Sequence, residues 1–549
     1  MVARKERWGS RVGLILAMAG NAVGLGNFLR FPAQAIQNGG GAFILPYLIC
    51  FVLMGIPLVW VEWAIGRHGG RYGHHSTPGM FQVLGTQRWL KYIGVLGLFA
   101  SITVAGYYVY IESWALAYVW HSAVGTFATE TPGQFFGAYV GSDRGTDLVF
   151  PAQAIFWFLV TVGLNVLVLS RGLAKGIELA AKIGLPLLIL FAGILVVRGL
   201  TLTPGDPGVI ESPLTGLNFI WEPRFSGLWD PSIWLAAAGQ VFFTLSLGMG
   251  SVHCYASYLR ANEDIALNAA SAGWLNEFVE VILGGSLIIP IATAYLGLNA
   301  VLDATSSGSG FNLGFLILPT LFQGWGWFAP IAGVLWFGLL FFAGITSSLA
   351  MGQSAIAFLE DELQMDRRKS ALGFGGILIV LGAFCILFYP GGSFDEFDFW
   401  SGTFVLVLFA LLESVIFSYL FGIEKGWEEI NRGAQLVIPK VFKVVLRFIT
   451  PALLCLVFIG ALFKPEDTWT AALESLVGGT GWTFSGDSVI GRVIHSGYEE
   501  YRWVDQDGSL TRAFVQDGTR AVLTLLFLGI CVLVWWALSR NRRNQGDGQ

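Results

Sequence analysis

The chain has 549 residues, of which 54% are hydrophobic, 14% aromatic and 13% charged, with a formal net charge of −5. Soluble domains carry about 25% charged residues, so this composition excludes an ordinary soluble protein and favours one that crosses a membrane several times. The absence of a long basic tract or a nucleic-acid-binding motif sets aside a nucleic-acid partner.

Runs of roughly 20 apolar residues predict twelve membrane-spanning helices. Most of the 32 Lys and Arg residues fall in the two termini and in every second loop between these runs. Positively charged loops stay in the cytoplasm, so both termini are expected there. The expected spans are residues 11–36, 41–68, 90–123, 150–170, 177–199, 231–256, 268–298, 327–360, 370–389, 398–422, 441–463 and 518–539.

Polar and flexible residues interrupt the first expected span. Residues 21–32 read NAVGLGNFLRFP, which places glycines, asparagines and Arg30 near the middle of the membrane. Lipid offers no partners to backbone groups that leave a helix, so such a stretch must be buried in protein. Arg30 also needs water or an acidic partner, and Asp398 is a candidate. The sequence therefore predicts a functional site at this break.

A second interruption, QVFFTLSLGMG at residues 240–250, lies in the sixth expected span. Matching breaks in the first and sixth spans are typical of an inverted-topology repeat of five plus five helices, at whose breaks helix N-termini attract anions and freed carbonyls hold cations. The predicted division is 1–199 for the first repeat, 200–422 for the second, and 423–549 for two further helices with an outer loop at 464–517.

Small polar residues accompany both breaks and two other spans. Their oxygen atoms suit a hard cation such as Na⁺, although interhelical hydrogen bonding alone would also explain them. These residues are Asn27, Thr244, Asn276, Thr346, Ser347 and Ser348.

Four carboxylates lie in apolar surroundings and must be paired, hydrogen-bonded or protonated, alternatives that the sequence leaves open: Glu62, Glu112, Glu280 and Glu413. His253 follows the second break without companions at metal spacing, so we expect a packed or hydrogen-bonded residue there. No nucleophile with a base and no metal-ligand set indicates an enzyme.

Four stretches resemble the neurotransmitter:sodium symporter family, and closely its bacterial amino-acid transporters such as the leucine transporter: residues 21–32, NGGGAF at 38–43, GQVFFTLS at 239–246 and DFW at 398–400. The resemblance extends from about Trp8 to Pro451. That family is also the standard example of broken-helix transporters.

The resemblance implies an all-α polytopic protein of 12 transmembrane helices in a bacterial-type inner (plasma) membrane. It implies sodium-coupled uptake of small neutral, mainly apolar amino acids by alternating access, with two Na⁺ ions and no organic cofactor, and it allows a homodimer. A non-transporting amino-acid sensor on the same fold and an ion channel remain alternatives.

Binding residues follow from the same resemblance. One Na⁺ would be held by Ala22, Asn27, Thr244 and Asn276, and the other by Gly20, Val23, Ala343, Thr346 and Ser347. Leu25, Gly26 and Tyr108 would bind the amino-acid carboxylate, and Ala22, Phe243, Thr244 and Ser246 its ammonium group. The side-chain pocket would comprise Val104, Tyr108, Phe243, Ser246, Met249, Ser347 and Met351.

The resemblance also implies two gates and a chloride-replacing carboxylate, Glu280, so transport is expected to be independent of chloride. The outer gate would comprise Arg30 and Asp398 above Tyr108 and Phe243, and the inner gate Lys5, Trp8, Tyr258 and Asp361.

The chain departs from this family at the inner gate and in the side-chain pocket. The family usually has Arg where Lys5 stands, and lysine lacks the planar two-pronged bond of arginine, so either Arg4 takes that role or the inner side opens more readily. Met249 and Met351 stand where the leucine transporter has Phe and Ile. Because methionine adapts its shape, we expect a broader range of apolar substrates.

Overall fold

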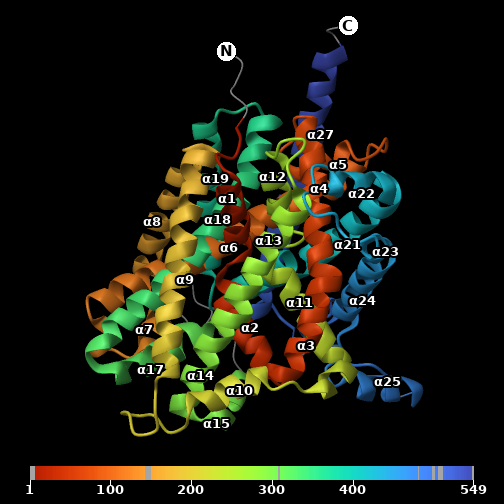
Figure 1. The fold of residues 1–549 in the computed structure, drawn as a ribbon. Coiled ribbons are helices and arrows are strands. Elements are labelled where there is room, and N and C mark those ends of the chain that lie inside the picture. The colour runs from red at the N-terminus through yellow and green to blue at the C-terminus, as the bar shows by residue number, and fades with distance from the viewer. Residues whose placement is uncertain are drawn as a thin grey trace.

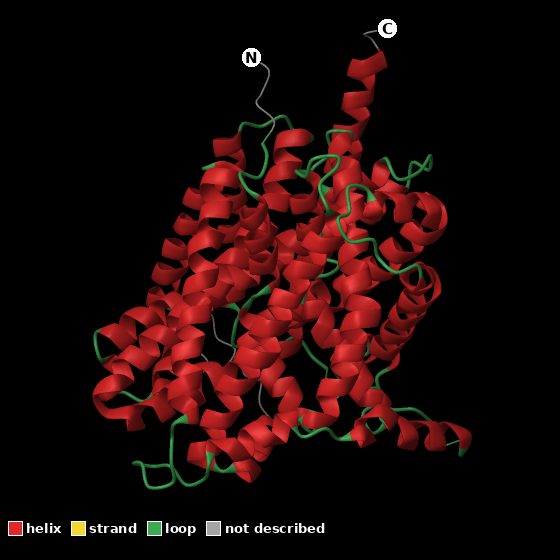
Figure 2. Cartoon of the chain, viewed as in Figure 1, coloured by secondary structure: helices red, strands yellow, loops and turns green. Residues whose placement is uncertain are grey.

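The computed structural model describes residues 6–141, 150–306, 310–479, 481–496, 501–504 and 511–546. Within these ranges the regular structure is helical, and β pairing is confined to two isolated bridges. Figures 1 and 2 show a bundle in which α1 (Arg11–Ala22) begins and α27 (Arg512–Gly546) ends on the same side. We call that side the terminal end and the other side the opposite end. The expected all-α membrane fold is confirmed.

Within the described residues, ten helices are long and apolar enough to cross a membrane. Several are built from consecutive segments joined by π-helical turns. Their bounds are Gly41–Arg71, Leu90–Ala123, Ala152–Leu169, Leu173–Leu200, Ile265–Leu296, Gly310–Asp361, Arg367–Leu387, Ser393–Asn431, Val441–Phe463 and Arg512–Ala537.

The helical segments within these spans are numbered in chain order, and most of them are labelled in Figure 1. They are α3 (Gly41–Cys50), α4 (Ile56–Arg71), α6 (Leu90–Ala123), α8 (Ala152–Leu169), α9 (Glu178–Leu200), α13 (Ile265–Glu277), α14 (Gly285–Leu296), α16 (Gly310–Asn312), α17 (Leu318–Phe322), α18 (Ala329–Asp361), α19 (Arg367–Leu387), α20 (Ser393–Phe399), α21 (Val405–Val415), α22 (Ile423–Asn431), α23 (Val441–Val444) and α24 (Thr450–Phe463).

Shorter helices cover the ends of the bundle. They are α5 (Thr77–Gln82), α7 (Pro132–Val140), α10 (Pro213–Trp221), α15 (Leu298–Ser306), α25 (Trp469–Val477) and α26 (Val489–Val493).

The two expected broken spans account for the remaining helices. The first span consists of α1 and α2 (Leu25–Gln37), which bend by 47° at their junction. The sixth consists of α11 (Pro231–Thr244) and α12 (Ser251–Ser257), separated by residues 245–250. Neither α11 nor α12 has the length of a span, so the described part of the chain supports ten or eleven spans and the count of twelve stays a prediction.

Helices α6 and α18 form the centre of the bundle and pack along each other. The most apolar part of α6 is 89% buried, whereas that of α27 is 22% buried, so α27 lies at the periphery. Tyr118 of α6 and Phe337 of α18 pack with ring centroids 4.6 Å apart. Helix α1 packs against α9, α13 and α18, and this packing carries the first break into the protein interior.

Candidate functional site

The first break exposes the N-terminus of α2 inside the protein. Helix α1 ends at Ala22, Val23 and Gly24 are extended, and α2 starts at Leu25. The Gly24 N–H donates to the Asn27 side-chain oxygen at 2.9 Å, and the Leu25 N–H donates to the Tyr108 hydroxyl at 3.0 Å. Amides of a first helical turn lack partners within their helix, so this turn suits an anionic group.

The second break is held open by unusual backbone geometry. Ser246, Gly248 and Gly250 have φ values of 53°, 71° and 80°. The Gly248 N–H donates to Glu62 Oε1 at 2.7 Å, and the Ser246 hydroxyl donates to the Asn21 carbonyl at 2.9 Å. The second contact joins the two breaks directly.

A first group of oxygen atoms lies where the breaks meet α13. The Asn27 amide donates to Asn276 Oδ1 at 2.8 Å, and the Asn276 amide donates to Thr244 Oγ1 at 2.8 Å. Glu280 accepts from Thr244 and, at 2.6 Å, from Gln240. These side chains are almost fully buried, and the described partners of Glu280 are neutral. A buried carboxylate needs a neutralising cation or proton, so the group fits a cation such as Na⁺.

A second group of oxygen atoms lies between α1 and α18. The Ser347 hydroxyl lies 3.3 Å from the Gly20 carbonyl, 3.2 Å from that of Asn21 and 3.2 Å from that of Ala343. Thr346 Oγ1 lies 3.2 Å from the Ala343 carbonyl. One hydroxyl proton cannot satisfy three carbonyls, so converging oxygens of this kind favour a hard cation.

The approach of α1 to α18 depends on Gly20, because a Cβ there would lie 3.0 Å from the Thr346 Cβ. Val23, the remaining residue expected in this group, is buried at the end of α1, where its N–H donates to the Ala19 carbonyl at 2.6 Å.

A cavity of about 20 Å³ lies between the two groups of oxygen atoms. This is roughly the space of one water molecule, so an amino acid enters only if the walls move apart. Leu25 and Thr244, which are also expected to bind the substrate, do not line this cavity. Leu25 is hydrogen-bonded to Tyr108, and Thr244 is hydrogen-bonded to Asn276. The lining residues are Ala22, Gly24, Gly26, Asn27, Val104, Tyr107, Tyr108, Phe243, Ser246, Met249, Ser347, Met351 and Gly402.

Arg30 and Phe243 lie over this cavity on the side of the opposite end. The Arg30 guanidinium carbon is 4.5 Å from the centre of the Phe243 ring. Asp398 accepts a 2.7 Å hydrogen bond from the Tyr107 hydroxyl. Arg30 and Asp398 both line a hollow of about 700 Å³, but they form no ion pair in the described part of the chain. Their role as a gate pair stays a prediction.

The expected inner-gate residues lie at the terminal end, except Lys5 and its alternative Arg4, which lie outside the described residues. Trp8 donates from Nε1 to the Tyr255 carbonyl at 3.1 Å. The Tyr258 hydroxyl accepts from Gln353 at 2.9 Å, and its ring stacks on His75 with centroids 4.2 Å apart. The His75 N–H in turn donates to Asp361 at 2.8 Å. These contacts tie α12, α18 and the segment before α5 together.

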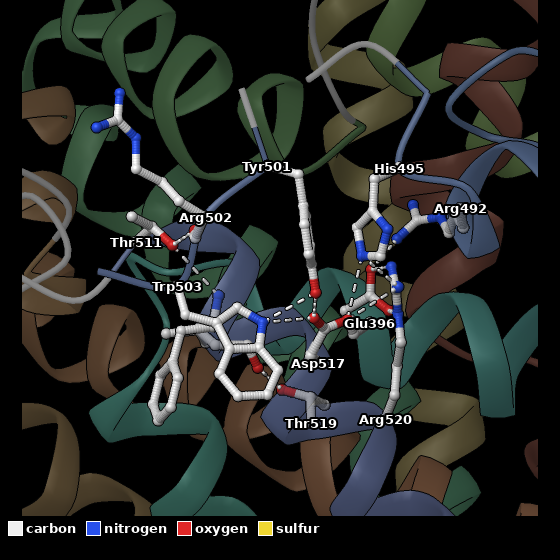
Figure 3. A network of polar contacts seen from close by, with 12 residues as sticks. Glu396, Arg492, His495, Tyr501, Arg502, Trp503, Thr511, Asp517, Thr519 and Arg520 are labelled. Carbon is white, nitrogen blue, oxygen red and sulfur yellow. Dashed lines mark hydrogen bonds and ion pairs between the residues drawn. The ribbon is translucent and has the colours of Figure 1, made fainter. Parts of the chain in front are cut away.

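A polar network joins the segment between α24 and α27 to α20 and α27 (Figure 3). Glu396 of α20 accepts from Arg492 at 2.6 Å and from Arg520 at 2.7 Å. Asp517 accepts from Trp503 at 2.9 Å and lies 3.1 Å from His495. Because α20 also carries Asp398, the network fixes one wall of the hollow above the cavity.

The structure also identifies polar groups to which the sequence assigned no role. The Asn21 carbonyl accepts from both Ser246 and Ser347, and the Gln240 amide donates to Glu280. Their position inside the breaks was the only available signal. Of the carboxylates left open, Glu112 is hydrogen-bonded by Asn165 at 3.2 Å. Glu62 and Glu413 both lie against His253.

Comparisons with known proteins agree with this geometry. The model of the "Sodium:neurotransmitter symporter family" matches residues 5–139 and 145–490. An uncharacterized sodium-dependent transporter of Methanocaldococcus jannaschii is 30% identical over 83% of this chain and 90% of its own. The sodium-dependent nutrient amino acid transporter 1 of Drosophila yakuba is 24% identical over 84% of this chain and 79% of its own.

Among solved structures, MhsT in complex with L-phenylalanine is similar, with a TM-score of 0.70 and 30% identity. The match covers 83% of this chain and 99% of MhsT.

Proposed function

Because the chain belongs to the sodium:neurotransmitter symporter family, whose members are transporters and not enzymes, we propose that it takes up small neutral, mainly apolar amino acids together with Na⁺. One observation carries the proposal. The two breaks meet through the Ser246–Asn21 contact, and the amides of α2 and two groups of oxygen atoms surround a single buried cavity. A zwitterion needs such an arrangement, with donors for its carboxylate and acceptors for its ammonium group.

The two Na⁺ sites would use the two groups of oxygen atoms. Asn27, Thr244 and Asn276 with the Ala22 carbonyl would hold an ion beside Glu280. Ser347 and Thr346 with the carbonyls of Gly20, Val23 and Ala343 would hold the other. The hydrogen bonds within each group support this division, because they bring the same oxygens together.

Amino-acid binding would use the first turn of α2 and the backbone of the second break. Leu25, Gly26 and Tyr108 would bind the carboxylate, and the Ala22 and Phe243 carbonyls with Ser246 would face the ammonium group. Most of the expected pocket residues line the one small cavity, which supports the assignment. MhsT, bound to L-phenylalanine, is consistent with a large apolar side chain at such a site.

Glu280 would supply the negative charge beside one Na⁺ and make transport independent of chloride. Both termini would lie on the cytoplasmic side of a bacterial-type inner membrane, and the opposite end of the bundle would face outside. Two gates would close in alternation. The outer gate would comprise Arg30 and Asp398, and the inner gate would comprise Trp8, Tyr258 and Asp361.

Radiolabelled leucine uptake into proteoliposomes tests the proposal. We expect accumulation with an inward Na⁺ gradient, none with K⁺ in its place, and no effect of replacing Cl⁻. Leucine binding without accumulation would favour an amino-acid sensor on the same fold. Sodium currents that need no amino acid would favour a channel.

A further inference from the structure

A cluster of three ionisable side chains lies apart from the amino-acid and sodium sites. It consists of Glu62 of α4, His253 of α12 and Glu413 of α21, and all three side chains are fully buried. His253 Nδ1 lies 3.5 Å from a Glu62 oxygen, and Nε2 lies 3.0 Å from a Glu413 oxygen. One imidazole therefore faces a carboxylate from each of its two ring nitrogens.

Among the described residues, the surroundings provide no other charge to balance these carboxylates. Helix α5 has no titratable side chain and contributes Phe81, whose ring, like that of Phe409 of α21, packs near the imidazole. Further along α4, Arg67 pairs with Glu429 of α22 at 2.9 Å. On α18, Asp361 accepts from the His75 N–H. In the described part of the chain, no Lys or Arg forms an ion pair with Glu62 or Glu413.

Charge balance then requires protons in the cluster. With both carboxylates ionised and the imidazole neutral, the cluster carries two negative charges in an apolar interior, which is strongly unfavourable. Two added protons, shared among the carboxylates and the imidazole, make it neutral. An imidazole can donate from one nitrogen and accept at the other, or donate from both, so it can share these protons with either carboxylate.

The cluster also contacts the second break. Glu62 Oε1 accepts from the Gly248 N–H at 2.7 Å, inside the break, and His253 lies on α12 directly after it. A rearrangement of residues 245–250 therefore changes the partners of Glu62 and the position of His253 relative to Glu413. Such a change alters the electrostatic surroundings of all three groups, and these surroundings set how tightly the groups hold protons.

We propose that Glu62, His253 and Glu413 form a proton-binding site whose proton occupancy is linked to the conformation of the second break. The bound protons come from water at one stage of the cycle and return to water at another. The existence of this proton-binding site does not depend on the proposed function. Its linkage to Na⁺ and amino-acid binding does rest on the proposed function.

Infrared spectroscopy of the purified full-length protein tests the site. Glu62→Gln and Glu413→Gln should each remove part of the carbonyl band of protonated carboxyl groups. The exposed Glu428→Gln on α22 is the control and should leave this band unchanged. If either variant fails to fold, His253→Gln keeps both carboxylates and should shift the band by removing the shared partner. An unchanged band in all foldable variants of the cluster overturns the proposal.

Elemental analysis of the same protein tests a different occupant. We expect no stoichiometric transition metal. A zinc ion that copurifies in the wild-type protein and is lost in His253→Gln would overturn the proton assignment in favour of a metal site.

A pH indicator in weakly buffered solution tests the linkage. Adding Na⁺ and leucine to the detergent-purified protein should cause proton uptake or release, which Glu413→Gln and His253→Gln diminish and Glu428→Gln does not. An unchanged signal in these two variants overturns the linkage. Failure of the proposed function would appear separately, as absent Na⁺-driven leucine uptake with the infrared result intact.

Discussion

Glu280 is a buried carboxylate whose described hydrogen-bond partners carry no charge. Its carboxylate accepts from Gln240, Thr244, Asn27 and Asn276, all of them neutral. Replacing Glu280 with Ser removes the negative charge beside the proposed Na⁺ and leaves space for an anion. We expect Glu280→Ser to transport leucine only when chloride is present, measured as uptake in chloride against gluconate.

Glu277→Gln provides the matched control, because Glu277 is also buried, one helical turn away, and bonds the Tyr47 hydroxyl at 3.0 Å. It should remain indifferent to chloride. Equal uptake by Glu280→Ser in the two salts would refute the charge assignment.

We expect Met249 and Met351 to let the cavity adapt to different side chains. Both line the closed cavity of about 20 Å³, which must expand around any amino acid. Unbranched methionines allow this at low cost. Leucine uptake should be inhibited by methionine and by aromatic amino acids, and the double substitution Met249→Phe with Met351→Ile should narrow that range.

Met80→Leu is the control for this experiment, because Met80 is buried on α5 and does not line the cavity. Inhibition of the wild-type protein by a single amino acid would contradict the prediction.

For individual residues, the sequence identified those that are unusual for a membrane span but missed the contacts between distant positions. Asn27, Thr244 and Asn276 stand out as polar residues in apolar runs, and the structure joins them by hydrogen bonds. The Asn21 carbonyl is invisible to composition, because a backbone group carries no sequence signal. The contacts of His253 with Glu62 and Glu413 join three different helices, so no local spacing reveals them.

The second break is an element whose shape depends on glycine. Gly248 has φ 71°, and a Cβ there would overlap the Leu406 carbonyl. A left-handed conformation costs about 1–2 kcal/mol for a residue with a Cβ, before any overlap is counted. We expect Gly248→Ala to lower the thermal midpoint in detergent and to abolish leucine uptake.

Gly239→Ala on α11 is the matched control, because a Cβ there meets nothing within 4 Å. In a helix this change should be neutral or stabilising by about 0.5–1 kcal/mol. Normal uptake by Gly248→Ala would show that the break does not need this conformation.

The network of Figure 3 joins α20 to the segment between α24 and α27. The Glu396 side chain is fully buried and bonds both Arg492 and Arg520. Removing its charge takes the shorter ion pair from two partly buried guanidinium groups, which keep only the longer contacts of Arg520 with Asp517 at 3.3 Å and of Arg492 with Asp487 at 4.0 Å. This loss destabilises by on the order of 3 kcal/mol. Glu396→Gln should therefore lower the thermal midpoint.

Arg512→Gln is the comparison for this variant, because its pair with Asp395 is exposed and 3.4 Å long. Exposed pairs contribute about 0–1 kcal/mol, so the midpoint should barely change. Equal shifts in the two variants would show that the network does not stabilise α20.

Most membrane-crossing elements were predictable, because length and apolarity define them. The expected span 90–123 coincides with α6, and 41–68 ends three residues before α4 does. The helices α10 and α25 were missed, because they lie in regions assigned to loops and are too short to span. The π-helical segment Phe278–Gly284, which carries Glu280, also escaped prediction, since it has no distinct apolar period.

For the whole molecule, the two proposed Na⁺ sites would set the driving force for uptake. Each Na⁺ gains about 2.3 kcal/mol at 100 mV, and a tenfold Na⁺ gradient adds about 1.4 kcal/mol. Two ions together supply roughly 7 kcal/mol, enough for about 10⁵-fold accumulation of a neutral zwitterion. Such coupling makes the limiting accumulation ratio of leucine depend on membrane potential.

That dependence also distinguishes pure sodium symport from symport with proton countertransport. Each net positive charge moved per cycle changes the limiting accumulation ratio of leucine by about 50-fold per 100 mV. Two Na⁺ ions moved per cycle therefore change this ratio by roughly the square of that factor. If the Glu62–His253–Glu413 cluster returns one proton outward in each cycle, the net charge falls to one and the dependence falls to about 50-fold. Proteoliposomes clamped with K⁺ and valinomycin measure this ratio directly.

Glu413→Gln should then restore the steeper two-charge dependence if the cluster moves the proton. Thr346→Val, which removes one hydroxyl from the proposed second Na⁺ site, should instead reduce Na⁺ affinity and leave the proton signal in place. A limiting accumulation ratio of leucine that depends on neither the membrane potential nor the Na⁺ gradient would exclude symport for this chain.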